Sequence, residues 1–215
     1  MRIPFRKQGV EKPAWSEPFE EGMRRGAASD FSGAEARFRE AVRLAPDEPY
    51  PHYELGYTLA LVGRYEEALE ELRRTQLARA FFTVETDIWV CERVLDGSLD
   101  DAAVGMLREL QRVIDAGGGQ SDEAVALSEK VIESAPQCAL GHFHFGKAVL
   151  GRDPVAAEQA LRRCIELSPD DTTAINAKGH IAILCERAGR EDEARSIRQR
   201  ILADYPGHPH TVFIN

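Results

Sequence analysis

The sequence lacks the features that mark membrane, secreted or nucleic-acid-coating proteins. Its longest apolar runs are a few residues, far short of the roughly 20 needed to span a bilayer. Residues 1–14 include basic side chains but no apolar stretch after them, so they do not form a secretory signal. Lys and Arg number 27 against 36 Asp and Glu, and the net charge of −9 excludes a protein built to coat nucleic acid or an anionic membrane.

Cysteine is also scarce. The four cysteines lie far apart inside helical patterns, as Cys91, Cys138, Cys164 and Cys185. They form neither a disulfide framework nor a paired zinc signature, so a cytoplasmic, reducing setting is the simplest expectation, with the mature form of an exported protein as the alternative. We expect Cys164 and Cys185 to face helix interfaces, and Cys91 to be the most exposed of the four.

Strand-forming residues are few. Aromatic residues make up only 7% of the chain, and Ala, Leu, Glu and Arg dominate, which predicts a mostly helical protein. Hydrophobic residues at 43% and charged residues at 29% are typical of a globular fold rather than a disordered chain.

Two short sequence motifs recur along the chain. The first is a turn followed by an acidic helix start and an alanine, at residues 30–36, 63–69 and 189–195. Ser32 with Glu35 reads as a capping box, and Asp153 before Pro154 marks another helix start. The second motif is a proline that ends a helix, at Pro46, Pro136, Pro169 and Pro206.

This pattern resembles the tetratricopeptide repeat (TPR) of bacterial-type repeat proteins, a helix–turn–helix unit of about 34 residues. That family favours a small residue within the first helix, small and large apolar residues at set places in the second, and a proline at the end. A repeat counted from residue 15 supplies the whole set, as Gly22, Ala34, Phe38, Ala41 and Pro46. Later repeats keep parts of it, including Gly56, Ala68, Leu72, Gly146, Ala157 and Leu161.

The resemblance implies an all-α fold, a right-handed α-solenoid of about five repeats and about eleven helices. The third repeat, counted from Thr83, is weaker because Val90 stands where a small residue is usual. An odd number of helices means that strict pairing fails once. We predict this irregularity near residues 96–121, with the helix of residues 121–134 lacking a partner of its own and the helix before it serving both neighbours.

The glycine-rich stretch at residues 117–120 predicts the domain organisation. We expect a basic segment at 1–14, an N-terminal lobe at 15–116, a C-terminal lobe at 121–208 and a tail at 209–215. The alternative is that the glycines form a long turn inside one continuous superhelix. Residues 1–14, 15–116 and 117–215 carry net charges of +3, −9 and −3, so the N-terminal lobe is predicted to be the acidic one.

The chain carries no recognisable catalytic motif. It has no glycine-rich phosphate loop, no nucleophile elbow and no His-Glu-x-x-His phrase. Its acidic pairs lie at helix starts, where the helix dipole explains them. We therefore predict a protein that is not an enzyme and needs no cofactor.

Histidines offer the remaining candidates for a metal site. Cys138 and His142 are four residues apart and share a helix face, whereas His142 and His144 point in different directions. A metal site needs three or four converging ligands, so we interpret these histidines as groove or surface residues, with Phe145 in the core. A metal-binding or enzymatic protein using Cys138, His142, His144 and His180 remains an alternative.

The resemblance also implies a binding surface, because the first helices of such repeats line a concave groove. Carried onto the N-terminal repeats, the groove positions are Phe19, Met23, Tyr50, Tyr53 and Tyr57. The tyrosines are spaced three and four residues apart on one helix face, which predicts an aromatic trough suited to an extended or helical peptide. The alternative is that some tyrosines pack between neighbouring helices.

In the C-terminal lobe the groove positions include Phe143, Lys147 and Asn176. Some family members hold a partner's C-terminal carboxylates with Lys and Asn at fixed groove positions. Phe19 and Met23 stand at the corresponding N-terminal positions, so that clamp is not reproduced there, although Lys147 with Asn176 could bind a carboxylate.

We therefore predict a non-catalytic adaptor or scaffold that binds a peptide or partner protein in its groove, without nucleic-acid binding or membrane insertion. A partner of the N-terminal lobe is expected to be apolar with basic flanks. The alternative is a self-assembling, homo-oligomeric scaffold, in which the apolar tail, residues 211–215, either covers the last helix or docks into another subunit's groove.

Overall fold

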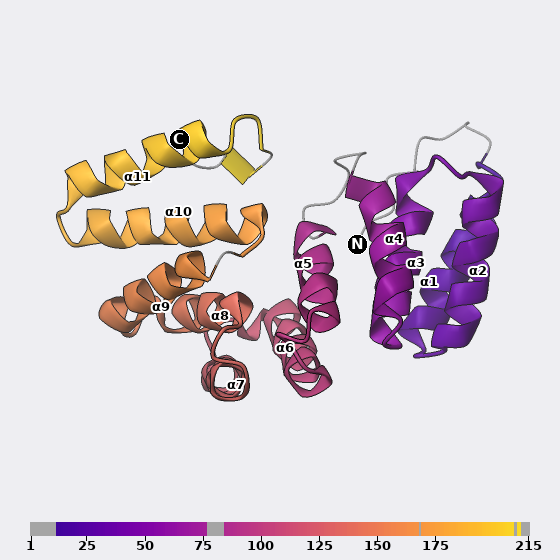
Figure 1. The fold of residues 1–215 in the computed structure, drawn as a ribbon, viewed down its shortest axis with the longest axis horizontal. Coiled ribbons are helices and arrows are strands. Elements are labelled where there is room, and N and C mark those ends of the chain that lie inside the picture. The colour runs from indigo at the N-terminus through magenta and orange to yellow at the C-terminus, as the bar shows by residue number, and fades with distance from the viewer. Residues whose placement is uncertain (1–11, 77–83, 168, 209, 212–215) are drawn as a thin grey trace. The chain divides into compact units, whose positions relative to one another are not determined.

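The computed structural model describes residues 12–76, 84–167, 169–208 and 210–211 (Figure 1). These residues form eleven α-helices and one short π-helical turn, and no strand occurs among them. The chain divides into two compact units, Met1–Ala80 and Phe81–Asn215, called here the N-terminal and C-terminal units. None of the described helices is long and apolar enough to cross a membrane.

The N-terminal unit contains two pairs of helices. They are α1 (Ser16–Ala27), α2 (Phe31–Leu44), α3 (Pro49–Leu61) and α4 (Tyr65–Gln76). Helix α1 packs on α2, α2 on α3, and α3 on α4. The predicted cap of α2 is displaced: Ser32 lies inside the helix, and Asp30 is the capping residue, accepting the Gly33 N–H at 3.0 Å.

The C-terminal unit contains seven α-helices. They are α5 (Val84–Leu95), α6 (Asp101–Val113), α7 (Asp122–Ser134), α8 (Ala139–Val149), α9 (Pro154–Glu166), α10 (Asp171–Arg187) and α11 (Glu191–Asp204), with the π-helical turn η1 (Ile114–Gly118) after α6. Helices α6 and α7, α8 and α9, and α10 and α11 form packed pairs, and each pair packs on the next. The prediction of an all-helical protein with about five repeats is confirmed, because five packed pairs are present besides α5.

Small residues allow the paired helices to approach closely. A Cβ added to Gly22 would lie 2.6 Å from Phe38 Cε1. A Cβ on Gly56 would lie 2.8 Å from Leu72 Cγ, and one on Gly146 would lie 2.8 Å from Leu161 Cγ. The repeat residues singled out in the sequence therefore meet in pairs across three of the helix interfaces.

The pairing irregularity differs from the prediction. The odd helix is α5, just before the predicted range, and α7 has partners on both sides because it packs on α6 and α8. Helix α5 packs instead on α10 and contributes Trp89 to the same core cluster as Leu140 and Phe143. Val90 of α5 stands where the repeat pattern has a small residue, and it packs against the same core cluster.

The boundary between units also differs from the predicted one. Helices α6 and α7 pack together across the glycine-rich stretch, where Gly117 has a φ of 88° that suits glycine in a tight turn. The stretch is therefore a turn within one unit, and the division falls at residue 80. Residues 1–80 then carry a net charge of −1 and residues 81–215 carry −8, so the C-terminal unit is the acidic one.

All four cysteines are buried free thiols. Cys164 and Cys185 lie at helix interfaces with 0% exposure, as predicted, but the expectation that Cys91 would be exposed is wrong, since its exposure is 1%. Burial raises the pKa of Cys91 to about 12, which keeps the thiol protonated and unreactive. Most of the predicted tail lies outside the described residues.

Candidate functional site

Three tyrosines of α3, called here the tyrosine face, lie on one side of the helix: Tyr50, Tyr53 and Tyr57. The rings of Tyr53 and Tyr57 are stacked, with centroids 6.3 Å apart and planes inclined by 16°. Tyr57 is 40% exposed, whereas Tyr50 and Tyr53 are partly buried. The helix therefore presents a stacked aromatic pair, one ring of which remains accessible.

Helix α1 supports this surface and also contacts α3. The predicted groove residue Phe19 is buried, packing 5.4 Å from the Trp15 ring and 5.8 Å from the Phe38 ring between centroids. Its role in the structure is to anchor α1 on α2, and little of its surface is left for a partner. Met23, one turn later, is partly buried.

Lys147 and Phe143 lie together on α8 in the C-terminal unit. Phe143 is buried, and the Lys147 ammonium lies 5.1 Å from its ring centroid, in a cation–π contact. Burial lowers the pKa of Lys147, because the charged form loses solvation. No ion pair to Lys147 occurs among the described residues, so this cation has an aromatic contact but no counterion there.

Two histidines of the same unit, His144 and His180, interact electrostatically with Lys147. The Nδ1 atoms of His144 and His180 are buried and have no hydrogen-bond partner within the described chain. Burial, assisted by the Lys147 charge, lowers the pKa of His144 to about 4 and also lowers that of His180. Both rings are therefore neutral near pH 7.

Asn176 is turned toward the end of the chain. Its amide nitrogen lies 3.2 Å from His210 Nδ1, and His208 Nε2 lies 3.3 Å from the Glu85 carboxylate. The described hydrogen bonds therefore place Asn176 with His210 rather than with Lys147. Sequence reasoning assigned no role to Glu85 or to this tail contact, because the residues are more than 100 positions apart.

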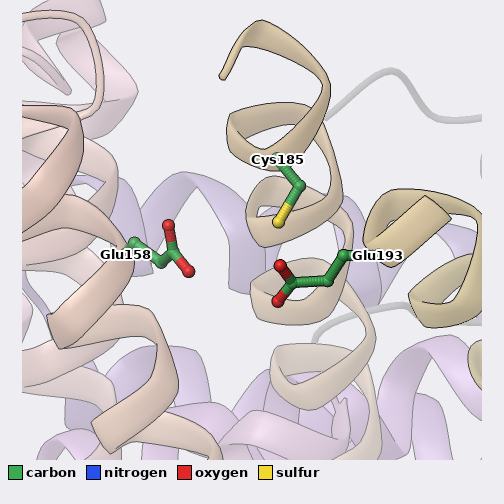
Figure 2. Close-up of side chains that lie close together, drawn as sticks. All are labelled: Glu158, Cys185 and Glu193. Atoms are coloured by element: carbon green, nitrogen blue, oxygen red, sulfur yellow. The ribbon is translucent and has the colours of Figure 1, made fainter. Parts of the chain in front are cut away.

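The Cys138, His142, His144 and His180 alternative does not form a metal site among the described residues. The group whose ligand atoms do converge there is Glu158, Cys185 and Glu193, within 4.8 Å of one another (Figure 2). Its carboxylates already have cationic partners. Arg162 lies 2.7 Å from both Glu158 and Glu193, and Arg190 bonds the same two residues.

These arginines explain the electrostatics of the group. The hydrogen bond from Arg190 is the main cause that lowers the pKa of the Glu158 carboxyl. The hydrogen bond from Arg162 is the main cause that lowers the pKa of the Glu193 carboxyl. Burial raises the pKa of Cys185, so its thiol is protonated rather than the thiolate that a metal needs. The cluster is an ion-pair network that joins α9 to the start of α11.

The chain is similar to known repeat proteins. Residues 19–81 match the family described as tetratricopeptide repeat. Cellulose synthase operon protein C of Xanthomonas axonopodis pv. citri (strain 306) is 27% identical over 184 residues, which are 85% of this chain and 11% of that protein. The chain thus spans about a tenth of that relative's length.

Two solved structures also resemble it. The thermophilic TPR protein TTC0263 of Thermus thermophilus is 21% identical, with a TM-score of 0.40 over 93% of this chain and 96% of that one. The TPR2AB domain of yeast Sti1, in its complex with pHSP90, is 15% identical, with a TM-score of 0.45 over 93% and 95%. The recurring motif residues and their pairing across helix interfaces agree with the family match, which shows a tetratricopeptide repeat within residues 19–81.

Proposed function

We propose that this protein is a non-catalytic interaction scaffold whose tyrosine face binds a peptide segment or a partner protein. The observation that carries the proposal is the stacked pair of Tyr53 and Tyr57, with Tyr57 40% exposed. Tyrosines are enriched at binding hot spots because their rigid rings offer large contact area and a hydroxyl at low entropic cost.

We propose that partly buried Met23 adds to this surface from α1, which contacts α3, while buried Phe19 anchors α1 on α2. The N-terminal unit is nearly neutral overall, so its net charge does not select a partner of either sign. A partner that presents a leucine, methionine or aromatic side chain would suit these rings.

Lys147 supplies a second contact point, in the C-terminal unit. A partly buried cation above the Phe143 ring, without a counterion among the described residues, favours a partner's carboxylate. Asn176 contributes less directly, because its amide is held by His210. Lys147→Gln is therefore expected to weaken binding of an acidic partner without unfolding the unit.

Quantitative affinity capture from native lysate, read by mass spectrometry, tests the tyrosine face. We expect Tyr53→Ala with Tyr57→Ala to reduce at least one specifically captured protein severalfold, while circular dichroism shows unchanged helix content. Leu44→Ser is the matched control, because Leu44 is a 39% exposed apolar side chain on α2 of the same unit. An identical set of captured proteins from the wild type and the double variant would contradict the proposal.

A further inference from the structure

A cleft of about 570 Å³ opens between α7, α8 and α9, away from the surfaces described above. Phe145 lines it, and because Phe143 precedes Phe145 by two residues, the two rings leave α8 on nearly opposite sides. The cleft is therefore separate from the Lys147 site. Its lining residues are Glu129, Ile132, Glu133, His142, Phe145, Ala156, Gln159, Ala160 and Arg163.

The α7 wall of the cleft is acidic. Glu129 and Glu133 are exposed, lie four residues apart on one helix face, and make no ion pair within the described chain. On the α9 wall, Arg163 is held by Glu166 at 3.1 Å and Gln137 at 3.2 Å. The floor between these walls includes the apolar side chains of Ile132, Phe145 and Ala160.

The second repeat shows why this cleft is open. His52 and His142 occupy equivalent places, each six residues after a proline whose carbonyl it contacts through Nε2, at 2.8 Å for Pro46 and 3.0 Å for Pro136. In the second repeat Glu71 reaches the other ring nitrogen, Nδ1 of His52, at 2.5 Å, and His52 is 2% exposed.

In the later repeat this carboxylate is missing. Ala68 of α4 corresponds to Ala157 of α9, so the residue three positions on is Glu71 in one helix and Ala160 in the other. With a methyl group in place of the longer side chain, His142 lines an open cleft, and its Nδ1 has no partner among the described residues.

Glu129, Glu133 and His142 line the cleft with hydrogen-bond acceptors. The Pro136 carbonyl can only accept, so His142 Nε2 donates to it, and in that imidazole tautomer Nδ1 is the acceptor nitrogen. Two carboxylates and this nitrogen thus line an apolar floor, in the unit that carries a net charge of −8. A ligand that fits this arrangement brings a cationic donor on an aliphatic stem.

We propose that this cleft between α7, α8 and α9 binds a lysine or arginine side chain of a partner's peptide segment, with an adjacent apolar side chain packed on Ile132 and Phe145. The Glu129 and Glu133 carboxylates receive the cation, and the apolar floor receives its stem and neighbour. This site does not depend on the tyrosine face, because it lies in the other unit and would bind a partner of a different chemistry.

Two amidated peptides, acetyl-Leu-Arg-Phe-Arg-Leu and acetyl-Leu-Glu-Phe-Glu-Leu, serve as probes of the full ¹⁵N-labelled chain by NMR. We expect the arginine peptide to shift the amide signals of Ile132, Phe145 and Ala160 at low salt, and the glutamate peptide to leave them unchanged. Shifts confined to other residues, or equal shifts with both peptides, would overturn the proposal.

Charge removal tests the acidic wall. Glu129→Gln with Glu133→Gln keeps the side-chain volumes, and we expect the affinity for the arginine peptide to fall about three- to tenfold, as for two partly exposed ion pairs. Glu66→Gln with Glu70→Gln is the control, because these exposed residues are also four apart and make no described ion pair, but lie on α4. An equal loss in both double variants would show general charge attraction instead of a site.

Refilling the cleft tests its geometry. Ala160→Glu copies the arrangement of Glu71 and His52, so the new carboxylate is expected to occupy the cleft beside His142. Binding of the arginine peptide should weaken although the variant is more acidic. Tighter binding would contradict the proposed cleft, because a purely electrostatic surface would gain affinity from the added charge.

Discussion

Glu85 and Thr172 are 87 residues apart in the sequence, yet the Glu85 carboxylate accepts hydrogen bonds from the Thr172 backbone N–H at 3.1 Å and from its hydroxyl at 2.8 Å. Asp170 accepts the next backbone N–H, that of Thr173, at 2.9 Å. Side chains from α5 and from the chain before α10 thus satisfy two of the N–H groups that a helix start leaves unpaired.

Removing the distant cap should destabilise the C-terminal unit. We expect Glu85→Ala to lower the free energy of unfolding by about 1–2 kcal/mol, because it removes a charged acceptor from a helix N-terminus. Urea unfolding measures this loss when it is followed by the fluorescence of Trp89 in a chain that also carries Trp15→Phe. Asp192→Asn is the control, since the Asp192 side chain is 96% exposed, and a loss of similar size there would argue against a specific cap.

The same contact shows where sequence reasoning reached its limit. Local spacing in the sequence predicts where helices begin and which prolines end them. It also predicts that Gly146 packs against Leu161. The position of α5 could not be predicted, because it depends on a hydrogen bond to a helix far along the chain. Val90 was the local sign that this repeat departs from the regular pattern.

The candidate sites divide in the same way. Helical spacing predicted that Tyr53 and Tyr57 share a face, and their rings stack. The resemblance placed Phe143 and Lys147 at groove positions, and the structure brings these two into a cation–π contact, whereas Asn176 bonds His210. The cleft between α7, α8 and α9 was not predicted, because it results from the small side chain of Ala160, which leaves space beside His142. Comparing Ala160 with Glu71 within the sequence would have marked the position, but only the packed helices show that a cleft results.

Replacing a glycine by alanine should lower the free energy of unfolding at a helix interface and raise it on an open helix surface. Gly146→Ala places a Cβ 2.8 Å from Leu161 and 3.1 Å from the Ala157 carbonyl oxygen, so we expect a loss of about 1–3 kcal/mol in unfolding free energy. Gly105→Ala in α6 has nothing within 4 Å and should gain about 0.5–1 kcal/mol from helix propensity. Thermal and urea unfolding of both variants test the difference, and a stabilised Gly146→Ala protein would contradict close packing.

The group of Glu158, Cys185 and Glu193 should not take up zinc. Two arginines bond its carboxylates, and its cysteine is a buried thiol with a raised pKa, so a cation would have to displace these charges. We expect isothermal titration of the wild type with Zn²⁺ to give no stoichiometric binding at this group. One bound zinc per chain that disappears in Cys185→Ser would show that the ion pairs yield to a metal.

The His52–Glu71 pair should make the stability of the N-terminal unit depend on pH. The Glu71 hydrogen bond, despite burial, raises the pKa of His52, and the Pro46 carbonyl on the other ring nitrogen also favours the imidazolium. A raised folded-state pKa means that the stabilisation is complete below the unfolded value of about 6.5 and is lost as pH rises through the folded value.

Glu71→Gln isolates this contribution. We expect the difference in unfolding free energy between the wild type and this variant to be largest near pH 6 and to shrink toward pH 9. Trp15 fluorescence in a Trp89→Phe background reports on the N-terminal unit, since the chain has only 2 tryptophans. His142→Gln supplies the comparison, because its ring contacts the Pro136 carbonyl without a described carboxylate partner. A difference that stays constant or grows with pH would mean that the Glu71 carboxylate does not stabilise a protonated His52.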